Sequence, residues 1–147
     1  MNARMRAIVG AISLSIVLSG CAGVPSIGVA DERTGGVPES FESATAGNDE
    51  PGFLEGPIVL AYADGGVDVI TWGSGSCPPR ATSAAKEGTE FVVSFEHDAQ
   101  GACTADMAPT THSFTASSVG SAVPEVARIS FPAYDEEHVV DVIAVED

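Results

Sequence analysis

Short apolar runs separated by turn residues fill the chain from residue 53 onward. The run 58–63 stops at an Asp-Gly-Gly triplet, and a second apolar run, 67–72, follows at once. Two runs of this length on either side of a glycine-containing turn predict a β-hairpin.

Alternation of apolar and polar residues marks the rest of this region. Every second residue of 90–96 is apolar, so one face of a strand would be buried, and 111–115 alternates in the same way. Two β-branched runs, 126–131 and 139–145, are separated by a proline and an acidic turn and predict two more strands. The segment 81–87 is interpreted as a loop or an edge strand, with a helical turn as the alternative.

These patterns predict an all-β domain. About seven short segments with turns roughly every 8 to 12 residues are typical of a small antiparallel β-sandwich of immunoglobulin-like architecture, and a small β-barrel is the alternative. The roughly 95 residues of 53–147 suffice for one hydrophobic core and are too few for two.

The N-terminal segment has the polarity of an export signal. Arg4 and Arg6 precede the apolar stretch 7–18, which is shorter than the ~20 residues that a membrane-spanning helix needs. The stretch ends in Leu-Ser-Gly-Cys, with Cys21 as its last residue, and resembles the lipobox of bacterial lipoprotein signals. The resemblance implies that residues 1–20 are removed and that Cys21 carries lipid, which would anchor the protein on the extracytoplasmic face of the cell membrane. An ordinary secretory signal is the alternative.

The segment that follows Cys21 is small, polar and acidic, with scattered Val, Ile and Phe and no sustained period. Such a segment buries too little apolar surface to offset its ordering entropy. We therefore expect 21–52 to be a flexible tether that holds the β-domain about 30 Å from the anchor.

Acidic residues outnumber basic ones by 21 to 6, which gives a formal net charge of −15. Removal of residues 1–20 would take away two basic side chains and no acidic one, leaving four against 21, or −17. A surface of this sign repels nucleic acid, whose binding depends on Lys and Arg, and we expect no nucleic-acid partner. It also repels anionic lipid headgroups, so the lipid on Cys21 would supply the membrane attachment.

The chain has three cysteines. Once Cys21 is assigned to lipid, Cys77 and Cys103 remain as a pair in a compartment that permits disulfides, and we expect them to be bonded. A two-cysteine metal site and a free thiol nucleophile are the alternatives. Neither has its partners, because there is no CxxC motif and no His within a few residues of either cysteine.

Trp72 begins an unusual stretch, WGSGSCPP, and the stretch CTADMAPTT follows over 103–111. The two resemble the WGSxSCP and CTxD segments of small exported proteins and lipoproteins of actinobacteria. The resemblance spans residues 62–111 and departs at Gly75, where serine is the commoner residue. It implies a shared fold and carries no catalytic assignment.

Five residues of these stretches are candidate ligand contacts, because they combine an aromatic ring with hydroxyl and carboxylate groups: Trp72, Ser74, Ser76, Thr104 and Asp106. Trp72 can instead pack in the core against the disulfide. Thr104 and Asp106 can instead satisfy the backbone amides of a turn.

The imidazoles of the chain are His97, His112 and His138, and none belongs to an HxH or HExxH pattern. His138 stands beside two glutamates and is interpreted as a solvated loop residue. The serines form no GxSxG motif. We therefore assign no catalytic residue, no metal ligand and no cofactor from the sequence.

Together these observations predict a cell-envelope lipoprotein with a non-catalytic domain that binds an envelope protein, a wall polymer or a small ligand. A small hydrolase or a metal-dependent enzyme of the envelope is the alternative, because 21 acidic side chains and three histidines leave room for a site assembled in space.

Overall fold

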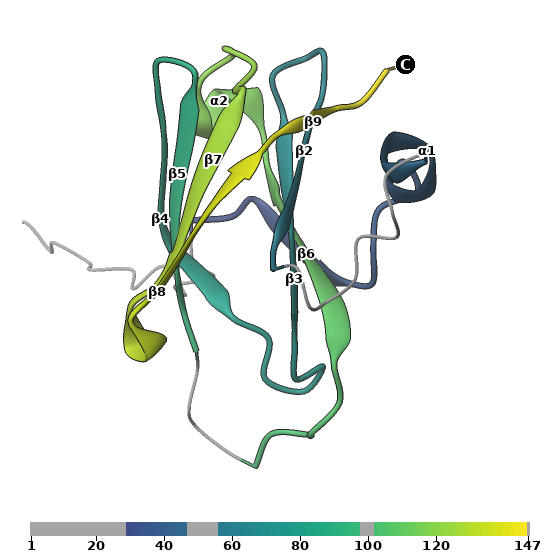
Figure 1. The fold of residues 1–147 in the computed structure, drawn as a ribbon, viewed down its shortest axis with the longest axis vertical. Coiled ribbons are helices and arrows are strands. Elements are labelled where there is room, and N and C mark those ends of the chain that lie inside the picture. Colours follow the sequence, from purple (N-terminus) through teal and green to yellow (C-terminus); the bar gives the residue numbers. More distant parts are fainter. Residues whose placement is uncertain (1–28, 47–55, 98–101, 147) are drawn as a thin grey trace, which may run out of the picture.

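Two β-sheets face each other in the computed structural model, which describes residues 29–46, 56–97 and 102–146 (Figure 1). A five-stranded sheet has the order β1-β6-β3-β2-β9, and a four-stranded sheet has the order β4-β5-β7-β8. The strands are β1 (Glu32–Gly35), β2 (Ile58–Ala61), β3 (Val67–Gly73), β4 (Arg80–Glu87), β5 (Glu90–Glu96), β6 (Ala108–Phe114), β7 (Val126–Phe131), β8 (Glu136–Asp141) and β9 (Ile143–Ala144). Short helical segments connect some of them: α1 (Phe41–Thr45), α2 (Ala116–Val119) and the 3-10 turn η1 (Pro132–Tyr134). The predicted all-β sandwich is confirmed.

Most neighbouring strands are antiparallel, but β2 with β9 and β5 with β7 are parallel. The β5–β7 pair is parallel because the chain crosses to the other sheet between them, where it forms β6 before it returns through α2. Parallel neighbours need such a long connection, whereas a tight turn makes an antiparallel pair. The antiparallel prediction therefore holds for the hairpins β2–β3, β4–β5 and β7–β8.

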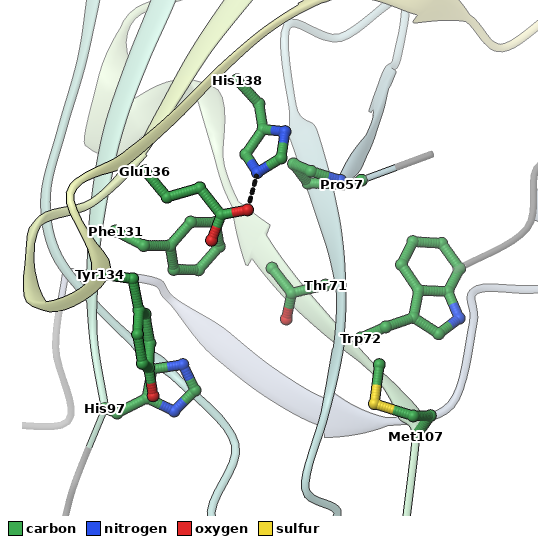
Figure 2. A pocket seen from close by; sticks show the side chains of 10 residues that line it. Pro57, Thr71, Trp72, His97, Met107, Phe131, Tyr134, Glu136 and His138 are labelled. Atoms are coloured by element: carbon green, nitrogen blue, oxygen red, sulfur yellow. Dashed lines mark hydrogen bonds and ion pairs between the residues drawn. The ribbon is translucent and has the colours of Figure 1, made fainter. Parts of the chain in front are cut away.

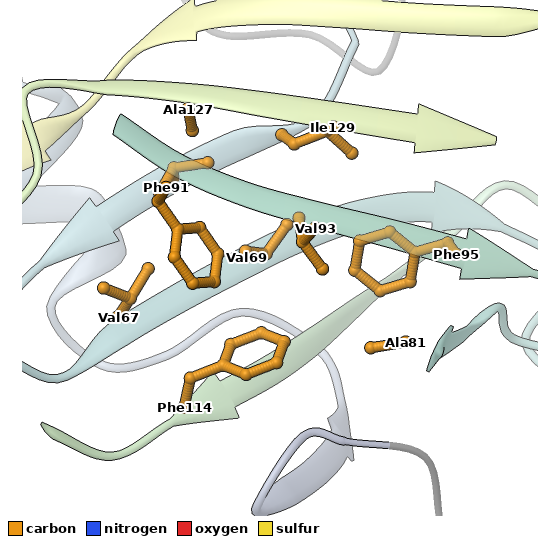
Figure 3. Packing of buried hydrophobic residues seen from close by; sticks show 10 residues of the cluster. Val67, Val69, Ala81, Phe91, Val93, Phe95, Phe114, Ala127 and Ile129 are labelled. Atoms are coloured by element: carbon orange, nitrogen blue, oxygen red, sulfur yellow. The ribbon is translucent and has the colours of Figure 1, made fainter. Parts of the chain in front are cut away.

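The main core fills the space between the sheets (Figure 3). Phe91, Val93 and Phe95 point inward from β5 and are fully buried, as the period-two pattern of 90–96 predicts. They pack with Val67 and Val69 of β3, and the rings of Phe91 and Phe114 meet edge to face at 5.3 Å. Burial of each such side chain contributes roughly 1.5 to 3 kcal/mol, so this layer is the main source of stability.

A second apolar cluster lies on the outer face of the five-stranded sheet. Ile58, Leu60 and Ile70 form its buried centre, and Phe41 of α1 packs on them. Because α1 covers this outer face, all four residues of β2 are buried, and the sequence of that strand is a continuous apolar run. Polar groups hold α1 in place, because the hydroxyl of Tyr62 donates to Asp68 at 2.7 Å and lies 3.0 Å from the hydroxyl of Ser40.

The predicted tether over 21–52 is wrong for the part that the structure describes, residues 29–46. Glu32–Gly35 forms β1, which pairs with β6, and the amide of Val29 donates to the carbonyl of Ala81 at 3.0 Å. All four residues of β1 are exposed, so this strand is held by backbone hydrogen bonds that leave no apolar pattern in the sequence. The predicted leader, residues 1–20, the predicted lipidation site Cys21 and the rest of the predicted tether, 22–28 and 47–52, lie outside the described residues.

The segment 81–87 is part of β4, an edge strand that pairs with β5, as one of the sequence interpretations predicts. The predicted acidic turn is shorter than expected, because Glu136 and Glu137 already belong to β8. Asp135 alone remains in the turn, with a left-handed φ of 54°. Within the described ranges, no helix is long and apolar enough to cross a membrane.

The predicted disulfide is confirmed: Cys77 is bonded to Cys103, with a Cα–Cα distance of 5.4 Å. The bond ties the chain that leaves β3 to the chain that enters β6. β3 and β6 are antiparallel neighbours, so their pairing already brings these two loops together at one end of the sandwich.

Candidate functional site: an aromatic cavity at one end of the sandwich

A cavity of about 400 Å³ opens where β3, β5 and β7 end and where β2, β6 and β8 begin. Its walls come from both sheets: Gly56, Pro57, Thr71, Trp72, His97, Met107, Phe131, Tyr134, Glu136 and His138. Figure 2 shows Trp72 and Met107 on one side, His97, Tyr134, Phe131 and Glu136 on the other, and Thr71 between them. The volume falls within the ~300 to 1,000 Å³ of small-molecule sites.

Aromatic rings continue from the core to the rim of this cavity. Phe131 stacks on the buried Phe95 with a centroid distance of 5.5 Å, and His138 meets Phe131 edge to face at 6.1 Å. His97 meets Tyr134 edge to face at 5.0 Å. The wall formed by the four-stranded sheet is therefore braced by the core, while Tyr134 is 60% exposed at the mouth.

Glu136 and His138 provide the polar edge of the cavity. They are two residues apart on β8, so both point to the same face, and Nε2 of His138 lies 3.1 Å from a carboxylate oxygen of Glu136. The interpretation of His138 as a solvated loop residue is wrong. The residue is part of a strand, and its side chain is only 25% exposed because it packs beside Phe131 and Gly56.

His112 is a buried histidine that contacts Thr71, the residue at the floor of the cavity. Nε2 of His112 lies 3.1 Å from the hydroxyl of Thr71, and the imidazole packs against Phe95 at a centroid distance of 4.7 Å. Burial, followed by the positive charge of Arg33, lowers the pKa of His112 to about 4, so the ring is neutral at pH 7. Its Nδ1 is buried and has no hydrogen-bond partner among the described residues.

Of the predicted ligand contacts, Trp72 lines the cavity, in the half-buried outer part of the second apolar cluster. Trp72 packs on this outer cluster because it lies on the opposite face of β3 from Val69. The alternative, packing of Trp72 against the disulfide, stays a prediction. Ser74, Ser76, Thr104 and Asp106 do not line this cavity.

These four side chains instead bind one another beside the disulfide. The hydroxyls of Ser74, Ser76 and Thr104 lie 3.0 to 3.2 Å apart, and the amide of Thr104 donates to Ser76 at 2.9 Å. Asp106 accepts from the hydroxyl of Thr104 and from the amide of Gly75, and both bonds lower the pKa of its carboxyl, Thr104 most. The interpretation of Asp106 as a partner of turn amides is confirmed. The cluster cross-links the two loops.

The presence of glycine at position 75 is explained by its neighbour Asp106. A Cβ at this position would lie 2.8 Å from Oδ2 of Asp106, so a residue with a side chain would displace that carboxylate. The close approach of Asp106 to the backbone therefore favours glycine here.

The sequence reasoning missed most of the cavity. Its residues are scattered from Gly56 to His138 and come together because the ends of six strands meet at one end of the sandwich. The available signal was local: His97 directly follows a strand pattern, and Phe131 and Tyr134 flank the proline that ends another. That signal marks strand ends, but it does not say that these ends converge.

No three His, Cys, Asp or Glu side chains in the described ranges are placed to hold a metal ion. No protein-family model, curated protein or solved structure matches the chain.

Proposed function

We propose that this chain is an exported, lipid-anchored binding protein whose β-sandwich takes a small ligand in the cavity at the end of the two sheets. The observation that carries the proposal is the aromatic lining of that cavity, which is built from both sheets and braced by the core through the Phe95–Phe131 stack. Concave sites with apolar and aromatic walls and few polar groups are the common form of small-ligand sites.

The polar groups of the cavity support binding rather than catalysis. A threonine nucleophile would need a histidine base that a third group orients. His112 contacts Thr71, but its other ring nitrogen has no partner in the described part of the chain, and its pKa of about 4 makes it a weak base. The pair instead supplies a fixed hydroxyl at the floor.

The proposed location rests on the lipobox resemblance at Cys21 and on the charge of the chain. Two or more acyl chains anchor a protein stably, whereas one chain binds only marginally. A net charge of −15 disfavours contact with anionic headgroups, so the domain would face away from the bilayer, toward solutes or wall polymers.

The binding proposal is tested by screening a fragment library by NMR on isotope-labelled protein. Trp72 is the only tryptophan of the chain, so its indole N–H gives one assigned signal inside the cavity. We expect hits that shift this signal together with the amides of His97 and Glu136. Hits confined to the exposed strand β4, or no hit, would contradict the proposal.

The anchor is tested separately in the bacterial cell by phase partition with a non-ionic detergent. We expect the wild-type protein in the detergent phase and Cys21→Ser in the aqueous phase, with Ser19→Ala as the matched control that keeps the thiol. Equal partition of Cys21→Ser and wild type would overturn the anchor and leave the binding proposal standing. Turnover of a substrate that Thr71→Val abolishes would overturn the non-catalytic assignment.

A further inference from the structure

The described residues that line the cavity include one carboxylate, that of Glu136, and no Lys or Arg. The imidazoles of His97 and His138 also line it, and Nε2 of His138 lies 3.1 Å from one oxygen of the Glu136 carboxylate. The basic residues after the leader are Arg33, Arg80, Lys86 and Arg128, and none of them is on its walls. Arg128 pairs with Glu90 at 2.9 Å and with Glu137 at 2.8 Å, and Lys86 donates to the carbonyls of Gly65 and Gly120. The cavity therefore has no Lys or Arg with which to hold a phosphate or a carboxylate.

The electrostatic field of the whole chain also favours a cation over an anion in the cavity. The formal net charge is −15, and a cleft with low-dielectric walls concentrates the field of the surrounding charges. A cation is therefore drawn toward the cavity, and an anion is repelled from it.

The aromatic walls suit a cation that also has apolar surface. Trp72, Tyr134 and Phe131 present ring faces or edges around the space, and Trp and Tyr attract cations through the negative potential of their ring faces (Figure 2). A metal ion would need several converging oxygen or nitrogen ligands, and the described residues do not assemble such a set.

We infer that the cavity binds a small organic cation, an alkylammonium compound, with its methyl or methylene groups against the rings of Trp72 and Tyr134 and its charge toward Glu136. The inference rests on the proposed binding function and names the ligand class. Thr71 adds a hydroxyl at the floor, which suits a ligand with a polar group at its other end.

The test compares two probes of the same shape that differ in charge, choline and 3,3-dimethylbutan-1-ol, with the full chain in a non-ionic detergent at constant ionic strength. The indole signal of Trp72 and its fluorescence report occupancy. We expect choline to bind between about twofold and thirtyfold more tightly than the neutral probe, which is the range of cation–π and partly screened charge interactions.

A pair of neighbouring variants separates the local charge from the field of the chain. Glu136→Gln should reduce the preference for choline at least about twofold and leave the neutral probe unchanged. Glu137→Gln removes the same charge, but Glu137 pairs with Arg128 and does not line the cavity, so this variant should keep the preference. Acetate and inorganic phosphate serve as anionic probes and should leave the indole signal unshifted.

The outcomes distinguish the two levels of the argument. The cation assignment would be overturned by equal binding of choline and its neutral isostere, by equal effects of the two glutamine variants, or by stronger binding of an anion. The binding function would still stand in these cases if any ligand occupies the cavity. A cavity that responds to none of these probes and to no member of the fragment library would overturn the binding function and the cation assignment together.

Discussion

The hydroxyl of Thr71 lies 3.1 Å from Nε2 of His112, so the floor of the cavity is joined directly to a fully buried imidazole. The two residues belong to the neighbouring strands β3 and β6, and the ring of His112 packs on Phe95 of the opposite sheet. One side chain thus takes part in the main core and in the proposed ligand site, and its protonation state matters for both.

The first prediction concerns pH. The pKa of His112 is about 4 in the folded chain and about 6.5 in an unfolded one, so the contribution of the neutral ring is complete above pH 6.5. As the pH falls from 6.5 toward 4, the unfolded chain takes up a proton that the folded chain does not. Stability is lost over that window, by about 3 kcal/mol in full. Urea unfolding at pH 7.5 and at pH 4.5 measures the loss.

His112→Gln is the control for this effect. The variant should lose at least about 2 kcal/mol less than wild type between the two pH values, because it has no imidazole to protonate. Carboxylates such as Asp31, whose pKa is lowered by the hydroxyl of Ser118, contribute equally to both proteins. Identical losses in the two proteins would show that His112 does not titrate as the structure implies.

The second prediction concerns the disulfide. Cys77 and Cys103 are 26 residues apart, and their bond should stabilise the domain by about 3.5 kcal/mol in the chain-entropy model. We expect Cys77→Ala/Cys103→Ala to unfold at a correspondingly lower urea concentration. Its NMR changes should stay near Ser76 and Thr104, since the main core lies between the sheets and does not include the bond. Loss of dispersion across the whole spectrum would contradict this view.

The third prediction concerns the segment before α1. A shortened chain that begins at residue 37 lacks β1 and keeps α1, so the backbone of β6 loses its partner along Thr110–Ser113. We expect lower stability and a greater tendency to aggregate, because an exposed strand edge can pair with another molecule. A chain that begins at residue 29 is the control and should match a chain that begins at residue 21 in thermal unfolding. Equal melting of both shortened chains would mean that β1 adds nothing.

The fourth prediction compares two glycines of positive φ. Gly65 has φ +87°, and a Cβ there would lie 2.6 Å from the carbonyl oxygen of Ser121, whereas Gly88 has φ +64° and open space around the same point. Gly88→Ala should cost about 1 kcal/mol for its backbone conformation alone. Gly65→Ala should cost at least about 1 kcal/mol more, because it also clashes with a backbone atom. Chemical unfolding of both variants measures the difference, and equal costs would contradict the contact.

Much of the fold follows from local patterns. The alternation in 90–96 predicts an inward face of Phe91, Val93 and Phe95, and all three are fully buried. The turn after the run 58–63 predicts the hairpin of β2 and β3. The odd number of cysteines led to the pair that the structure shows bonded. In each case, a short stretch of chain carries its own signal through period, turn chemistry or residue type.

Other features have no local signal. β1 is exposed along its length, so its sequence resembles that of a polar linker, and only the free edge of β6 makes it a strand. His138 and its glutamates have the sequence of a hydrophilic turn, but the pairing of β7 with β8 makes them part of a strand, and Glu136 and His138 form part of one wall of the cavity.

The amino-acid sequence alone was enough for the class of fold, the main core strands and the disulfide, because these depend on periodicity and on the chemistry of single residues. The placement of Trp72, Thr71, Glu136 and His138 around one space depended on the tertiary structure. These residues lie on two strands of different sheets, β3 and β8, up to 67 positions apart in the numbering, and nothing local to any of them records which strand ends meet. The crossover between the sheets, which is a property of the whole chain, decides it.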